Sequence, residues 1–128
     1  MRILLDTHAV IWAAFSKNRL SEKARAVLEN KANELVVSAA SAWEIATKVR
    51  LGRMPGAEEL ESDFAGRLQR AGYRLLSIDV TTALRAGRFS GDHGDPIDRI
   101  LAAQALAEDI PIVSIDSRLD VFCVRRIW

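Results

Sequence analysis

The chain has 128 residues, with 18 lysines and arginines against 17 aspartates and glutamates, so its net charge is close to zero. This length predicts a single domain spanning residues 1–128, and the balanced charge gives no argument for nucleic-acid binding by the molecule as a whole. A polyanionic partner must therefore contact a local cluster of basic side chains. No apolar run approaches the roughly 20 residues that cross a bilayer, and no signal-peptide pattern is visible. We expect a cytoplasmic protein without membrane contact, in which the one cysteine, Cys123, packs in the core.

Short apolar runs alternate with longer helical stretches along the chain. The runs cover residues 3–5, 35–37, 75–78 and 112–115, and a last apolar segment, 121–124, is a candidate edge strand. Such alternation predicts βαβ units and a parallel sheet covered on both faces. The expected fold is therefore a three-layer α/β/α domain with a central, mainly parallel sheet of four to five strands.

Helix signals fill the intervals between these runs. Ser21 and Asp79 are good N-caps, Gly72 suits the position after a helix end, and Pro96 suits the first position of a helix. After the first strand, helices are predicted over about residues 22–31, 39–49, 57–71, 80–87 and 96–108.

Acidic residues stand at the ends of predicted strands or near the starts of predicted helices. These acids are Asp6, Asp79, Asp116, Asp95, Asp98 and Glu44. Most have an ordinary structural alternative as helix caps, and we interpret Asp79 as a cap only. Glu44 completes a capping box if Ser41 caps its helix, whereas a cap at Ser38 would put Glu44 in the second turn, with Lys48 on the same face.

The possible convergence of these acids points to a metal ion. The carboxyl ends of parallel strands lie along one edge of the sheet, where such folds bind ligands. Two like charges about 4 Å apart cost roughly 4 kcal/mol at an effective dielectric of about 20, so several acids there require a cation. Ligand sets made only of oxygen favour Mg²⁺ or Mn²⁺ and usually serve phosphates. His8 and His93 lack a zinc-like spacing, and we expect both to be surface or supporting residues.

Four stretches, in order, resemble a PIN domain of the VapC toxin type. They are Leu4-Leu5-Asp6-Thr7-His8, then 37–48, then 95–105 beginning Asp95-Pro96-Ile97-Asp98-Arg99, and Val113-Ser114-Ile115-Asp116. The resemblance implies an Mg²⁺- or Mn²⁺-dependent endoribonuclease of a VapBC-type module, usually a homodimer. It also implies a VapB-like antitoxin partner that inactivates the toxin, often by placing a basic side chain in the acidic pocket.

The resemblance also assigns residues to the site. The family's acids fall on Asp6, Glu44, Asp98 and Asp116, with Asp95 as a second candidate for the third acid. Thr7 resembles the family's hydroxyl neighbour of the site.

The acids hold one or two metal ions in the resulting hypothesis. These ions would polarise the scissile phosphate and activate water, so no side chain need be the nucleophile. One carboxylate, for which Glu44 is a candidate, would accept the proton of the water.

Basic and aromatic side chains near the acids have two possible roles. Lys48, Arg50, Arg53, Arg99 and Arg118 lie close to them in sequence and either contact RNA phosphates or form a solvated face. Four aromatic residues are expected in the core, with a partner surface as the alternative; they are Trp12, Phe15, Trp43 and Phe64.

Two other function classes remain as alternatives. A dehalogenase-type phosphatase needs a second acid two residues after Asp6, but that residue is His8. A phosphotransfer receiver needs a lysine after a late strand, but Ser117 and Arg118 follow Asp116. Both are therefore disfavoured. The third possibility is a non-catalytic binding module whose carboxylates are all caps, and such a module would bind no Mg²⁺ with useful affinity.

Overall fold

The computed structural model describes all of residues 1–128 and contains one five-stranded sheet in the order β3-β2-β1-β4-β5, with every neighbouring pair parallel. The strands are β1 (Arg2–Leu5), β2 (Glu34–Ser38), β3 (Arg74–Leu76), β4 (Ile112–Val113) and β5 (Arg126–Ile127). The predicted α/β class and parallel sheet are therefore confirmed.

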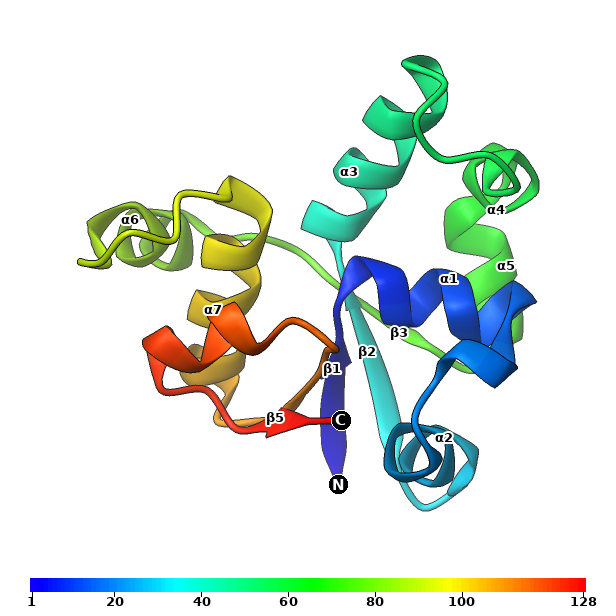
Figure 1. The fold of residues 1–128 in the computed structure, drawn as a ribbon, viewed down its shortest axis with the longest axis horizontal. Coiled ribbons are helices and arrows are strands. Elements are labelled where there is room, and N and C mark those ends of the chain that lie inside the picture. The colour runs from blue at the N-terminus through cyan, green and yellow to red at the C-terminus, as the bar shows by residue number, and fades with distance from the viewer.

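Helices cover both faces of the sheet. The α-helices are α1 (Thr7–Phe15), α2 (Glu22–Glu29), α3 (Ala39–Arg50), α4 (Glu58–Ser62), α5 (Phe64–Arg70), α6 (Val80–Arg88) and α7 (Pro96–Glu108). Two short 3₁₀ helices are η1 (Lys17–Arg19) and η2 (Ser117–Phe122). Figure 1 shows α6 and α7 on one side of the strands, with α1, α2, α4 and α5 on the other. No helix is both long enough and apolar enough to cross a membrane.

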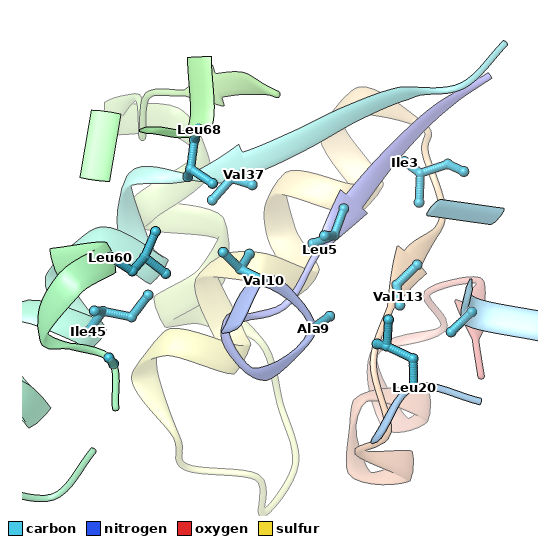
Figure 2. Close-up of a cluster of buried hydrophobic side chains, with 12 residues drawn as sticks. Ile3, Leu5, Ala9, Val10, Leu20, Val37, Ile45, Leu60, Leu68 and Val113 are labelled. Atoms are coloured by element: carbon cyan, nitrogen blue, oxygen red, sulfur yellow. The ribbon is translucent and has the colours of Figure 1, made fainter. Parts of the chain in front are cut away.

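The core consists of two hydrophobic clusters, one on each face of the sheet. Strand β1 contributes to both, because successive side chains of a strand point to opposite faces. Ile3 and Leu5 pack with α1, α4 and α5, as Figure 2 shows for this cluster. Leu4 faces the other way and packs against Leu101 of α7 and Phe122 of η2. The central strand is thereby buried on both faces, which explains its continuous apolar run.

Several boundaries differ from the prediction. The helix expected over 57–71 is interrupted at Asp63, and Leu60 of α4 and Leu68 of α5 both lie in the first cluster. The third strand ends at Leu76 and the fourth at Val113, because the parallel pairing stops there.

The end of the chain contradicts the prediction more strongly. Residues 121–124 form no strand; Val121 and Phe122 belong to η2, and the edge strand is β5. Cys123 is exposed rather than buried; it ends η2 in a left-handed conformation with φ 61°, and Leu119 and Phe122 are the buried residues of η2.

Two of the four aromatic residues expected in the core are on the surface. Trp12 and Phe64 are partly buried against the first cluster, as expected. Phe15 and Trp43 are exposed, and Trp43 presents 63% of its surface to solvent. Ala9 and Val10 supply the buried apolar contacts of α1, and Ala40 and Ile45 supply those of α3.

Candidate active site

The candidate site lies at the carboxyl edge of the sheet, between β1 and β4. The chain leaves β1 toward β2 on one side, while β4 pairs with β1 on the other side. Crevices at such a switch point are where open α/β sheets bind ligands. Asp6 follows β1 and Asp116 follows β4, so these two strand-end acids flank the crevice.

Asp6 is a buried carboxylate that also caps α1. Its Oδ1 accepts a hydrogen bond from the backbone N–H of Ala9 at 2.8 Å, and only 6% of the residue is exposed. Burial raises the pKa of Asp6 to about 6, and the nearby negative charge of Asp98 acts in the same direction. The structural role as a cap is therefore present, but an exposed cap would not carry this penalty.

The alternatives for Glu44 are resolved by the start of α3. Ser38 is the N-cap, since its Oγ accepts a hydrogen bond from Ala40 N–H at 3.0 Å. Ser41 lies inside the helix, where the Thr7 hydroxyl donates a hydrogen bond to its Oγ at 3.0 Å. The capping box is excluded, and Glu44 instead bonds Lys48 Nζ at 3.0 Å. Thr7 thus ties α1 to α3 beside the site.

Asp95 and Asp98 have different positions at the start of α7. Asp95 is the N-cap and accepts hydrogen bonds from the backbone N–H groups of Ile97 and Asp98 at 2.9 and 3.1 Å. Asp98 lies in the first turn, with its side chain 18% exposed and its Oδ2 2.8 Å from His93 Nε2. Burial raises the pKa of Asp98, as do the charges of Asp95 and Asp116.

Asp116 is held by a cation. Arg118 donates from Nε to Oδ1 at 3.0 Å and from a terminal guanidinium nitrogen to Oδ2 at 2.8 Å. The Arg118 guanidinium lowers the pKa of Asp116 below its ordinary value, and the backbone N–H of Arg118 adds to the effect. This carboxylate therefore stays ionised in acid where Asp6 and Asp98 do not.

These side chains line one cavity of about 330 Å³. Its walls are formed by Asp6, Thr7, His8, Glu44, Lys48, Asp95, Asp98, Ile115, Asp116 and Arg118. Five carboxylates face two permanently cationic side chains, so the cavity has an excess of negative charge. An all-carboxylate set of this kind fits a hard divalent cation, which would offset both the burial of the charged carboxylates and their mutual repulsion. The possibility that every acid is only a cap fails for Glu44 and Asp98, which are not N-caps.

The predicted basic residues divide into two groups. Lys48 and Arg118 line the cavity, while Arg50 and Arg53 are exposed near the far end of α3 and are not part of its wall. Arg99 does not line the cavity either, and its role as an RNA contact stays a prediction. Its guanidinium donates to backbone carbonyls at the end of α6 and in the following loop, those of Ala86, Gly87, Phe89 and His93. It thereby fixes the loop that precedes α7.

His93 has the supporting position that was one of the two expected from the sequence. The partner, Asp98, was not predicted, because the contact depends on the path of the loop between α6 and α7. His93 and Asp98 are five residues apart, and no rule of helix or strand spacing predicts a contact at that separation. His8 lines the cavity and packs against Trp12 with ring centroids 5.4 Å apart and planes tilted by 43°.

Comparison with known proteins assigns the chain, with its cluster of carboxylates at the sheet edge, to a family. The model of the PIN domain family matches residues 3–124. The chain belongs to the PIN domain family. This confirms the resemblance seen in the sequence, and it accounts for acids that meet from four separate stretches.

Two curated relatives indicate which kind of PIN-domain protein this chain is. Ribonuclease VapC22 of Mycobacterium tuberculosis is 30% identical over 120 residues, which is 91% of this chain and 88% of that protein. Ribonuclease VapC16 of the same organism is 44% identical over 55 residues, so the match covers 43% of this chain and 39% of that protein. These relatives place the chain among the VapC-type ribonucleases, which is the class of enzyme that the sequence predicted.

Solved structures agree on the fold. VapBC2 from Rickettsia felis, bound to a DNA fragment from its promoter, matches with a TM-score of 0.68 and 14% identity over 98% of this chain and 97% of that one. A toxin-antitoxin complex from Klebsiella pneumoniae matches with a TM-score of 0.61 and 15% identity over 92% and 89%. At these identities the likeness concerns the fold alone.

Proposed function

We propose that this PIN-domain protein is an Mg²⁺- or Mn²⁺-dependent endoribonuclease that acts in the cytoplasm as the toxin of a VapBC-type pair. The observation that carries the proposal is the convergence of Asp6, Glu44, Asp98 and Asp116 on one negatively charged cavity at the switch point of the sheet. The names of the two curated relatives support RNA as the substrate.

The four acids are the proposed ligands, with Asp95 as a second candidate because only its Oδ1 is used in capping. A divalent cation bound there would polarise the scissile phosphate and lower the pKa of water. Glu44 is the proposed proton acceptor, since its carboxylate lines the cavity and Lys48 is the one side chain that donates to it. Lys48 and Arg118 would contact phosphate oxygens of the RNA, and such contacts position the chain rather than read its sequence.

An antitoxin is the proposed regulatory partner, supported by the toxin-antitoxin complex among the structural neighbours. The excess of carboxylates in the cavity gives an independent physical reason for inhibition by a cationic side chain, which would neutralise the acids and block metal binding. We also propose a homodimer, as the family resemblance implies.

Cleavage of RNA by the purified protein tests the proposal. We expect cleavage with Mg²⁺ or Mn²⁺, none with EDTA, and loss of activity in Asp6→Asn and Asp98→Asn. Asp79→Asn is the matched control, because Asp79 also ends a strand run and caps a helix, by accepting from Thr82 N–H at 2.7 Å, but lies outside the cavity.

Calorimetric titration with Mn²⁺ supplies a second readout. The wild type and Asp79→Asn should bind the ion, and Asp6→Asn should bind it much more weakly. Full activity of Asp6→Asn would contradict the mechanism, and absence of Mn²⁺ binding by the wild type would favour a non-catalytic module.

A further inference from the structure

His93 lies beside the acids without being one of the proposed ligands. It belongs to the loop between α6 and α7, and its Nε2 is 2.8 Å from Asp98 Oδ2. Only 8% of its side chain is exposed. A buried imidazole bonded to one oxygen of a carboxylate restricts the rotation of that carboxylate, because turning it would break the bond and leave a polar nitrogen buried without a partner.

The imidazole is itself held from two directions. Its ring packs against the ring of Phe122 in η2, with centroids 5.7 Å apart and planes tilted by 32°. Its backbone carbonyl accepts a hydrogen bond from the Arg99 guanidinium at 2.9 Å, and the same guanidinium holds the carbonyls of Ala86 and Phe89. Arg99 thus fixes the backbone of the loop, and Phe122 fixes the plane of the ring.

Direct metal ligation by His93 is the competing role, because one nitrogen of His93 and one oxygen each of Asp98 and Asp116 lie within 4.8 Å of one another. The hydrogen bond argues against it. An ionised Asp98 oxygen only accepts, so Nε2 carries the hydrogen in this bond and has no lone pair for a metal, which excludes ligation through Nε2 while the bond is present. The second oxygen of Asp98 remains free to face the cavity.

We infer that His93 is a positioning residue, which orients the Asp98 carboxylate for the divalent cation by donating from Nε2 to Oδ2. The inference rests on the proposed function and adds a residue outside the four acids. Partners of ligating side chains of this kind typically change metal affinity or activity 10- to 100-fold when they are removed.

Two substitutions at the same position separate hydrogen bonding from packing. His93→Leu keeps an apolar group against Phe122 and removes the donor, whereas His93→Gln places an amide N–H near the position of Nε2. Asp92→Asn is the matched control, because Asp92 is exposed in the same loop and outside the cavity. Mn²⁺ binding is measured by calorimetry, and urea unfolding in EDTA reports the stability of each variant.

The expected result is a 10- to 100-fold weaker affinity for Mn²⁺ in His93→Leu, an affinity within about threefold of the wild type in His93→Gln, and no change in Asp92→Asn. Wild-type affinity in His93→Leu would overturn the inference, and so would equal losses in the Leu and Gln variants. If His93→Leu does not fold, His93→Asn takes its place, because its amide is too short to reach Asp98.

The same titrations distinguish failure of this inference from failure of the proposed function. If Asp6→Asn loses Mn²⁺ binding while His93→Leu keeps it, the metal site stands and His93 has no positioning role. If the wild type binds no Mn²⁺ at all, both are overturned.

Discussion

Replacing Asp6 by asparagine should make the metal-free protein more stable at neutral pH while abolishing its activity. Asparagine is as good an N-cap as aspartate, so the hydrogen bond from Ala9 N–H is kept. What changes is the charge, which the wild type must bury beside Asp98. A residue that weakens the fold in order to hold a cation is the pattern expected of a functional site.

The magnitude follows from the pKa of Asp6. It is raised from the ordinary 3.8 to about 6, a difference of about two pKa units at about 1.4 kcal/mol each. Between these two pH values the folded protein binds more protons at this group than the unfolded chain, so the free energy of unfolding falls as pH rises. Relative to the wild type, Asp6→Asn should therefore gain nothing below pH 4 and about 3 kcal/mol above pH 7.

Urea unfolding followed by tryptophan fluorescence, from pH 4 to 8 in EDTA, measures this difference. Asp79→Asn should show the opposite sign, because the hydrogen bonds from Thr82 lower the pKa of Asp79 and favour its charged form. Mn²⁺ at 100 times its dissociation constant should stabilise the wild type by about 2.7 kcal/mol and leave Asp6→Asn unchanged. A stability difference between Asp6→Asn and the wild type that is absent, negative or independent of pH would refute the reasoning.

Four further substitutions have defined outcomes. Arg99→Ala should lower the free energy of unfolding by about 2 kcal/mol, since partly buried carbonyls lose a charged donor. Leu101→Ala should lower it by about 2–5 kcal/mol through a core cavity. Urea unfolding measures both. Cys123→Gly should raise that free energy by about 1 kcal/mol in the same assay, because glycine relieves the left-handed backbone. Arg118→Gln should tighten Mn²⁺ binding in calorimetry by freeing Asp116, yet weaken RNA binding in a filter assay; unchanged values for both would contradict its dual role.

Local signals account for what could be predicted. The alternation of short apolar runs with capped helices predicted the parallel sheet. A parallel strand that is buried on both faces requires an unbroken apolar run, as residues 3–5 show. The candidate acids were predictable for a related reason: each follows a strand or lies near the start of a helix, and the family resemblance supplied their order. Their roles as metal ligands remain a prediction.

Contacts between distant segments account for what the sequence missed. The edge strand forms at Arg126–Ile127 because that segment pairs with β4. Trp43 looks like a core residue by composition, yet α3 buries a different face.

The amino-acid sequence by itself determined the α/β class, the candidate acids and the family, because each depends on residue type and local spacing. Only the tertiary structure decided that Ser38 caps α3, that Arg99 holds a loop and that His93 bonds Asp98. Those outcomes depend on which elements meet at the carboxyl edge between β1 and β4, where the packing of the two helical layers on the sheet sets the distances.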